Sequence, residues 1–282
     1  MHMCSRRHFL ARTAGLMAAS AVVPPFVFGA EQGACIKVGT CTMGLVLAKQ
    51  AGFDGVEISA GSPADDLDVN KADTRSRYKG QMQQTALPIT SIMMALFNEC
   101  PLATDPRASA WIKQGIDAAK DLKAKNILLA FFSKGDLLSG TQLKEEEFNA
   151  AAQRIKALAP YAKEAGVTLT IENYLNAEQN LRMLELIGDE SVCLYYDVYN
   201  TGKTKKYDSP AEIRRLKGRI AQVHYKNGSQ YLDEDKPHFQ AVSAALKDIG
   251  YKGWITLETS SPSQNPIEDG KRNAAFVRSL FS

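Results

Sequence analysis

The sequence has no excess of charge of either sign and none of the glycine-rich motifs that bind nucleotides. Its 282 residues include 34 basic and 31 acidic residues, a formal net charge of +3 at pH 7. This balance argues against a general nucleic-acid-binding protein, which would carry a clustered basic surface. No G-x-G-x-x-G follows the first strand-like run and no Walker lysine is present. Both absences disfavour an open nucleotide-binding sheet.

Paired cysteines and long apolar runs are also lacking. The five cysteines show no C-x-x-C spacing, so no metal or redox motif can be read from them. The longest apolar stretch, from about residue 14 to residue 28, is interrupted by Pro24 and Pro25. It falls short of the roughly 20 residues that a membrane-spanning helix needs.

The first 30 residues have the features of an export signal. The letters S-R-R-H-F-L at residues 5–10 match the twin-arginine pattern, and Gly29 and Ala30 supply small residues for cleavage. We therefore expect residues 1–30 to be a twin-arginine signal peptide, and the mature protein to be periplasmic and to meet the membrane only through this signal. An N-terminal anchor is the alternative. Removing the leader takes away three arginines and no acid, which leaves 31 basic and 31 acidic residues.

What is present is a regular alternation of strand-like and helix-like segments. Strand-like runs recur near residues 36, 55, 89, 126, 167, 192, 220 and 254, with helical periodicity between them. Three helix starts are indicated where a capping side chain precedes a proline, at Asp105, Ser209 and Asn265. Eight such units fit a closed (β/α)8 TIM barrel, a fold of about 250 residues. We expect residues 31–282 to form one such domain.

Four ionisable residues stand at or near the ends of the later strand-like runs: Glu172, Asp197, His224 and Glu258. Because successive side chains along a strand point to opposite faces, each of the four shares the more polar face of its run. In V-T-L-T-I-E, for example, Glu172 lies with Thr168 and Thr170. If the strands are neighbours in a parallel barrel, the four side chains converge at its C-terminal face, where such barrels place their active sites.

Three carboxylates and one imidazole are a suitable shell for one divalent cation. Sites of this composition suit Mn²⁺, Mg²⁺ or Co²⁺, with Zn²⁺ as a further option. We expect one bound ion, with Mn²⁺ first among these. Each residue could instead have a purely structural role. The glutamates could form ion pairs, His224 could be a hydrogen-bonded histidine inside the barrel, and Asp197 could cap a turn.

Five short motifs carry a resemblance to a known family. They are G-V-E-I at 55–58, T-I-E-N at 170–173, Y-D-V-Y-N at 196–200, V-H-Y-K-N at 223–227 and G-Y-K-G-W-I-T-L-E at 250–258. Over roughly residues 35–282 the chain resembles the sugar phosphate isomerase/epimerase family of the xylose isomerase-like TIM barrel superfamily. The resemblance maps the family's Glu, Asp, His, Glu metal set onto the same four residues. It also implies that Glu172 and Glu258 act on the substrate from opposite sides.

The resemblance implies an isomerase or epimerase of a keto-sugar or related polyol. The metal would polarise the ketone and stabilise an enediolate while the two glutamates transfer protons. Lys226, Glu57 and Asn200 are the expected substrate-binding residues, with Lys226 suited to neutralise oxyanion charge and Glu57 suited to contact the sugar or a lysine. The chain departs from ketose 3-epimerases in carrying Asn200 where they carry a histidine. It also lacks the arginine that follows their histidine ligand.

Other functions are compatible with the same residues. A lyase or dehydratase acting on a keto-sugar or keto-glycoside would share the first, enediolate-forming step. A non-catalytic sugar-binding barrel is a third possibility, and a homo-oligomer is left open. A nuclease of the endonuclease IV type ranks last, because it needs several histidines and only His224 and His238 remain beyond the leader.

Overall fold

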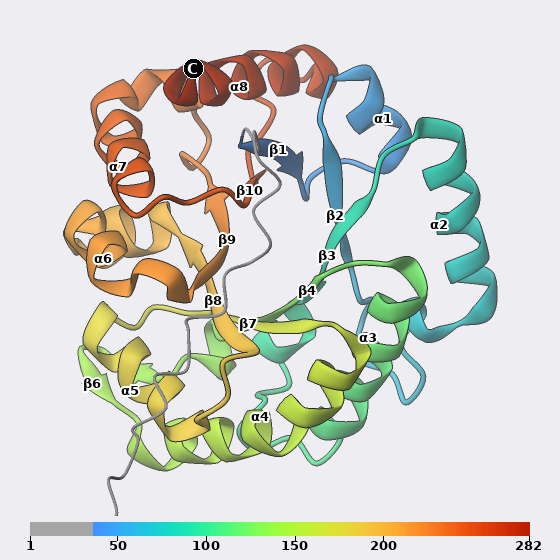
Figure 1. Cartoon of the computed structure of the whole chain (residues 1–282), viewed down its shortest axis with the longest axis vertical. Coiled ribbons are helices and arrows are strands. Elements are labelled where there is room, and N and C mark those ends of the chain that lie inside the picture. Colours follow the sequence, from blue (N-terminus) through green and yellow to red (C-terminus); the bar gives the residue numbers. More distant parts are fainter. Residues whose placement is uncertain (1–35) are drawn as a thin grey trace, which may run out of the picture. The chain divides into compact units, whose positions relative to one another are not determined.

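Residues 36–282, which a computed structural model describes, contain eight parallel strands that close into a barrel (Figure 1). The barrel strands are β1 (Lys37–Thr40), β2 (Gly55–Ser59), β3 (Ile89–Met94), β4 (Asn126–Ala130), β7 (Thr168–Glu172), β8 (Val192–Asp197), β9 (Ile220–Tyr225) and β10 (Trp254–Leu257). They are hydrogen-bonded in chain order, and β10 returns to β1. The predicted (β/α)8 TIM barrel is confirmed.

The α-helices form an outer ring that follows the strands around the barrel (Figure 1). They are α1 (Leu45–Gln50), α2 (Ala72–Thr85), α3 (Ala108–Leu122), α4 (Glu145–Ala165), α5 (Ala177–Ile187), α6 (Ser209–Leu216), α7 (Lys236–Asp248) and α8 (Pro266–Phe281). Short elements lie in the connections: η1 (Asp68–Asn70), η2 (Ala95–Asn98), η3 (Ser133–Gly135), β5 (Leu138–Ser139), β6 (Gln142–Leu143), η4 (Asn200–Thr204), η5 (Lys217–Arg219) and η6 (Leu232–Asp235).

The main hydrophobic core lies between the barrel and the helices. Outward-facing strand residues such as Ile127, Leu169 and Val223 are fully buried, as are Trp111 of α3 and Phe239 of α7. The strands that carry Glu172, Asp197 and His224 turn an apolar face to this layer and the face with the ionisable residue to the lumen, whereas a second, small apolar cluster of Leu128, Ala130 and Tyr195 lies apart from the main core. The strand periodicity therefore decides which side chains can reach a site inside the barrel.

The lumen below the strand ends is filled by a hydrogen-bonded polar layer. The Gln222 carbonyl oxygen accepts a bond from Asn126 (2.6 Å), and its amide nitrogen donates to Tyr195 (2.8 Å) and Thr256 (2.8 Å). These side chains are all buried. Because buried polar groups are costly unless they are paired, this network fixes the side chains on which the upper layer rests.

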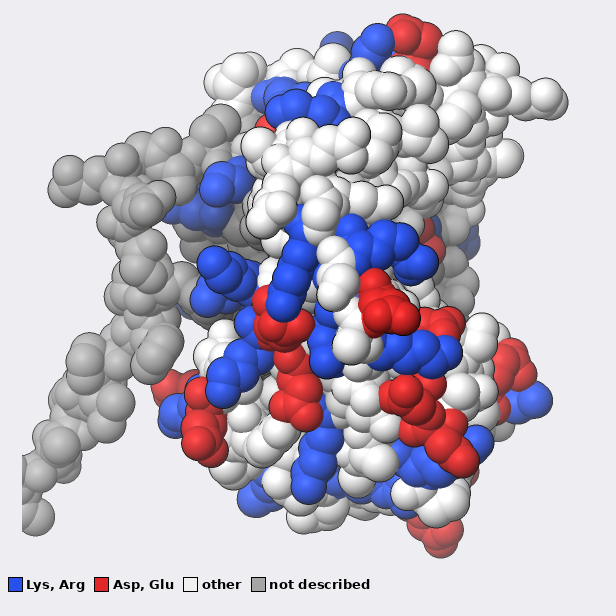
Figure 2. Space-filling model, turned by 90° about the vertical axis from the view of Figure 1, so that its right-hand side faces the viewer, with Lys and Arg blue, Asp and Glu red and all other residues white. Residues whose placement is uncertain are grey.

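Outside the barrel, charged side chains of both signs are interspersed on the side where α2 lies (Figure 2). There Arg75 and Lys79 of α2 both pair with Asp121 of α3, at 3.0 and 2.6 Å. No helix in the described part of the chain is long and apolar enough to cross a membrane. The predicted signal peptide at residues 1–30 lies outside the described residues, so it stays a prediction.

Of the three predicted helix starts, one is confirmed and two are displaced. Asn265 caps α8 by accepting a bond from the Glu268 N–H. At α6 the cap is Asp208, one residue before the predicted Ser209. The third helix, α3, begins at Ala108, and Asp105 instead closes a turn by accepting the Arg107 N–H (2.9 Å).

Candidate metal centre

The four predicted metal ligands meet at the C-terminal end of the barrel. Glu172 ends β7, Asp197 ends β8, His224 lies near the end of β9 and Glu258 directly follows β10. One potential ligand atom of each lies within 4.8 Å of those of the other three. These four strands are consecutive in the barrel, so the residues form an arc along one side of the lumen mouth.

The imidazole of His224 is held between this cluster and a fourth carboxyl group, that of Glu57. Its Nδ1 lies 3.2 Å from Glu172 and 3.7 Å from Glu258, whereas its Nε2 lies 3.0 Å from Glu57 on β2. Glu57 in turn accepts a bond from the Ser91 hydroxyl (2.5 Å). A carboxylate on the far nitrogen is the usual device that fixes the orientation of a metal-binding histidine. Nδ1 is therefore the nitrogen directed at the cluster.

Asp197 has one oxygen engaged and one available. Its Oδ1 accepts the backbone N–H groups of Tyr199 (2.8 Å) and Asn200 (2.7 Å). Its Oδ2 is buried without a hydrogen-bond partner among the described residues. Lys226 Nζ is 3.1 Å from this oxygen but is not aligned for a hydrogen bond, and it donates to Glu258 at 2.8 Å.

Burial and crowding of like charges shape the electrostatics of the cluster. Burial raises the pKa of Glu172 to about 7 and also raises the pKa of Asp197. For Glu258 burial acts in the same direction, but electrostatic attraction to His224 and Lys226 outweighs it and lowers the pKa. Burial by itself would lower the pKa of His224, yet its anionic neighbours hold that pKa well above its usual value.

The residues present fit a divalent cation. Four carboxyl groups gather around one imidazole and one ammonium group, and an uncompensated buried carboxylate is costly. Oδ2 of Asp197, which is near Lys226 but accepts no hydrogen bond, is an acceptor that a cation would satisfy. Carboxylate oxygens with one imidazole nitrogen are a donor set for Mn²⁺, Mg²⁺, Co²⁺ or Zn²⁺.

The three predicted substrate-binding residues have different surroundings. Lys226 is within reach of the cluster and is about one-fifth exposed. Glu57 is fully buried against His224 and not beside a lysine, so it lies behind the imidazole rather than in front of it. Asn200 contributes its backbone N–H to Asp197 and begins the turn of η4. Substrate contact by any of the three stays a prediction.

One neighbour of the site was not predicted from the sequence. Cys41 directly follows β1, and its sulfur lies within 4.8 Å of potential ligand atoms of Glu57 and His224. Burial raises the pKa of Cys41 to about 12, so the group is a neutral thiol. The register pairs Thr40 with Leu257, which sets Cys41 level with Glu258. The four ligands were found by looking for ionisable residues at the ends of strand-like runs. The same search at the end of the first run would have found Cys41.

Comparisons with known proteins agree with this architecture. The family model described as xylose isomerase-like TIM barrel matches residues 45–280. A solved L-ribulose 3-epimerase structure superposes with a TM-score of 0.70 at 22% identity, covering 87% of this chain and 94% of that one. A 3-keto-D-glucoside 4-epimerase from E. coli superposes with a TM-score of 0.69 at 15% identity, covering 86% of this chain and 99% of that one. A D-allulose 3-epimerase from Methylomonas sp. superposes with a TM-score of 0.69 at 17% identity, covering 87% of this chain and 98% of that one.

Identities this low establish a shared fold and leave activity open. No curated protein sequence matches the chain.

Proposed function

The chain belongs to the family of xylose isomerase-like TIM barrels, and from this premise we propose that it is a divalent-metal-dependent isomerase or epimerase of a keto-sugar or related polyol. The observation that carries the proposal is the convergence of three carboxyl groups and one imidazole from four consecutive strands. Several solved structures of the same fold are named as epimerases of keto-sugars, which supports this reaction class.

Glu172, Asp197, His224 and Glu258 would hold the ion, with His224 binding through Nδ1. A bound divalent cation would polarise the substrate ketone and stabilise the negative charge that develops on its oxygens. Asp197 is suited to remain a fixed ligand, because two backbone N–H groups orient its carboxylate. Glu57 would keep the imidazole ring from turning.

Glu172 and Glu258 are the proposed proton-transfer groups. They stand on the two outer strands of the four-strand arc, with Asp197 and His224 between them. A substrate lying over the arc would therefore have one glutamate at each side, as removal and return of a proton on opposite faces requires. Positioned groups of this kind contribute on the order of 10²–10⁴-fold to the rate.

Lys226 is the proposed partner of the substrate oxygens. Its ammonium group already bridges Asp197 and Glu258, and attraction to these carboxylates outweighs burial and raises its pKa. The side chain therefore stays protonated. It is placed to offset negative charge on a hydroxyl or on the oxygen of the former ketone.

Metal content after reconstitution is the first test of the site. The full chain, loaded with Mn²⁺ and freed of unbound ion, is expected to hold about one ion by elemental mass spectrometry. His224→Ala should lose it, and His238→Ala, a half-buried histidine on α7 outside the cluster, should keep it. No bound metal in the wild type, or equal loss in both variants, contradicts the proposal.

Exchange of solvent deuterium into keto-sugars is the test of the chemistry. Glu172→Gln and Glu258→Gln are each expected to abolish exchange while the far-ultraviolet circular dichroism stays unchanged. Near wild-type exchange in either variant would rule out the two-glutamate mechanism. A product whose mass is lower than that of the substrate by one water would identify the reaction as a dehydration instead of an isomerisation.

The cellular location also remains a proposal. We infer from the twin-arginine letters at residues 5–10 that the protein is exported to the periplasm. Replacing Arg6 and Arg7 by lysine should leave the unprocessed chain in the cytoplasmic fraction. A processed chain in the periplasm of such cells would show that export does not depend on these arginines.

A further inference from the structure

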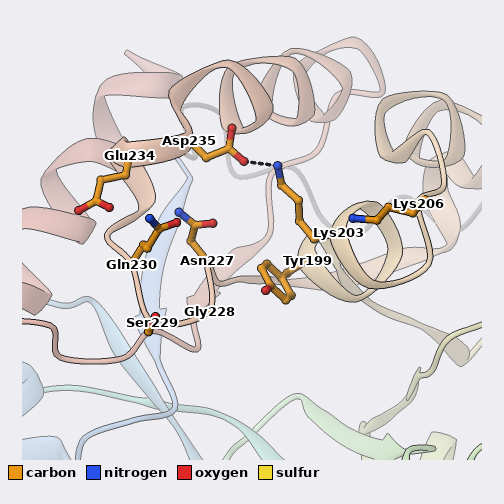
Figure 3. Close-up of a pocket in the computed structure, with 9 residues that line it drawn as sticks. All are labelled: Tyr199, Lys203, Lys206, Asn227, Gly228, Ser229, Gln230, Glu234 and Asp235. Atoms are coloured by element: carbon orange, nitrogen blue, oxygen red, sulfur yellow. Dashed lines mark ion pairs between the residues drawn. The ribbon is translucent and has the colours of Figure 1, made fainter.

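A polar pocket of about 590 Å³ opens between the chain segments that follow β8 and β9 (Figure 3). One wall is formed by residues from 199 to 206 and the other by residues from 227 to 235. The volume falls within the range of about 300–1,000 Å³ that is typical of small-molecule sites. None of the functions considered above uses this pocket.

The pocket adjoins the cluster on both strands. Tyr199 follows Asp197 by two residues and donates its backbone N–H to the Asp197 carboxylate. Asn227 directly follows Lys226, whose ammonium group contacts Asp197 and Glu258. Two residues of extended chain span at most about 7 Å. Both walls of the pocket thus begin within two residues of the cluster, which brings the pocket within reach of a group attached to a substrate there.

The lining favours an uncharged group rich in hydroxyls. Lys203 is ion-paired with Asp235 across the pocket, so its charge is already compensated (Figure 3). The other two charged residues of the lining, Lys206 and Glu234, are of opposite sign, so the pocket has no net charge to attract a phosphate or carboxylate. Among the residues that line the pocket none is Leu, Ile, Val, Met or Phe, which disfavours an apolar group. The amides, carboxylates and ammonium groups together offer donors and acceptors suited to sugar hydroxyls.

The pocket walls are held in place by contacts that do not involve a ligand. The Asn227 amide donates to the Tyr231 carbonyl (2.8 Å), and the Tyr231 hydroxyl donates to Asp269 of α8 (2.7 Å). Gly228, with a φ of +59°, lies against the Tyr199 hydroxyl, where an added Cβ would approach to 3.2 Å. A pocket built before binding loses little entropy when a ligand enters.

We propose that this pocket is a subsite for a second sugar ring, so that the substrate is a keto-glycoside or keto-disaccharide rather than a free ketose. The keto unit would lie at the metal cluster, and the uncharged ring attached to it would lie between Tyr199 and the segment 227–235. This inference rests on the proposed function, which places the keto unit at the cluster.

Sugars without a ketone test the subsite separately from the reaction, because they cannot be turned over. The full chain loaded with Mn²⁺ is titrated calorimetrically with methyl α-D-glucoside and with trehalose, maltose and cellobiose, each of which adds a second glucose ring. At least one disaccharide is expected to bind tenfold more tightly or better. Each hydrogen bond to the second ring is worth about fivefold in affinity.

The double variant Gln230→Ala/Glu234→Ala removes two exposed side chains of the pocket. It is expected to reduce the preference for the disaccharide to within about twofold. The matched control, Gln153→Ala/Glu164→Ala, removes the same two residue types from the exposed surface of α4 and should keep the full preference. Equal binding of one-ring and two-ring sugars by the wild type, or a preference that survives in the pocket variant, overturns the subsite.

The 3-keto derivatives of the same sugars then report on the reaction. Absence of deuterium exchange with all of them would refute the proposed function. A calorimetric preference that depends on Gln230 and Glu234 would still support the subsite in that case. The two failures are thus distinguishable.

Discussion

Glu57 shows how a residue that is too deep to touch a substrate can still control the site. Its carboxylate is fully buried, and its only ion-pair partner in the described part of the chain is His224, whose Nε2 lies 3.0 Å away. The Ser91 hydroxyl holds the second carboxylate oxygen. Rotation of the imidazole would break the Glu57 contact, so the ring presents Nδ1 to the other three ligands.

Glu57→Gln is therefore expected to weaken Mn²⁺ binding by about 10–100-fold, because a neutral amide lacks the negative charge with which the carboxylate orients the imidazole and strengthens it as a ligand. The measurement is a competition titration against a metal-binding dye, with the thermal midpoint of the metal-free protein as a second readout. That midpoint should change little, since the side-chain volume is kept. Glu99→Gln, an exposed glutamate paired with Lys134, is the control and should bind Mn²⁺ normally. Unchanged affinity in Glu57→Gln would contradict the positioning role.

The sequence allowed the lumen residues to be identified but not all of their contacts. Alternation along each run correctly predicted that Glu172, Asp197 and His224 face the lumen. It could not predict that Glu57 meets His224, because β2 and β9 are not neighbours. Contacts across a barrel depend on strand tilt and stagger, which no single run encodes.

At the scale of elements, Asp269 of α8 links two connections, the one between β9 and α7 and the one between β10 and α8. It lies in the first turn of α8 and accepts bonds from Tyr231, Ser261 and Ser263. Tyr231 belongs to the segment after β9 that forms one wall of the sugar pocket. Although burial opposes the shift, these hydrogen bonds lower the pKa of Asp269 to about 2.

Because this pKa is lower in the folded than in the unfolded chain, the bonds stabilise the fold fully above about pH 4, and this contribution is lost as the pH falls towards 2. Asp269→Asn is expected to cost about 1–3 kcal/mol at pH 7. Thermal unfolding at several pH values should show the gap to wild type closing between about pH 4 and pH 2. Asp248→Asn, which loses an exposed pair with Arg214, should cost less than about 1 kcal/mol. A gap for Asp269→Asn that is independent of pH would refute the assignment.

Helix starts were predicted less well than helices, and α6 shows why. Asp208 and Ser209 are both good caps, and the sequence does not say which one is used. In the structure Asp208 caps the helix by accepting the Ala211 N–H (3.1 Å). The Ser209 hydroxyl is buried instead, 3.1 Å from that of Thr201. A tertiary contact with the segment after β8 thus decides between two locally equivalent residues.

For the molecule as a whole, the N-terminal end of the barrel is closely packed around Gly55, the first residue of β2. A Cβ added there would lie 2.7 Å from a methyl group of Thr90 and 2.8 Å from the ring of Trp254. Thr90 belongs to β3 and Trp254 to β10. Gly55 on β2 is therefore packed between side chains from the two strands that flank the β1–β2 pair. An added side chain would force the side chains of Thr90 and Trp254 to shift.

Gly55→Ala should therefore destabilise the protein by about 1–3 kcal/mol through overpacking. Gly80→Ala is the matched control, because Gly80 lies inside α2 with nothing within 4 Å of an added Cβ. That change should stabilise by about 0.5–1 kcal/mol through its higher helix propensity. Urea unfolding of the two variants measures both effects. Equal stabilities would mean that the barrel end tolerates an added methyl group.

The pairing of β1 with β10 also means that the barrel cannot close until almost the whole chain has been synthesised. The Thr40 hydroxyl bonds the carbonyl of Leu257, 217 residues later. At translation rates of about 5–20 residues per second, the first strand waits roughly 10–40 s before its second partner emerges. Throughout this interval one edge of the nascent sheet has no strand beside it, and such edges recruit other chains. Cells making this protein are thus expected to need a chaperone on the nascent chain, and any stop codon before β10 would yield an aggregating product rather than a smaller barrel.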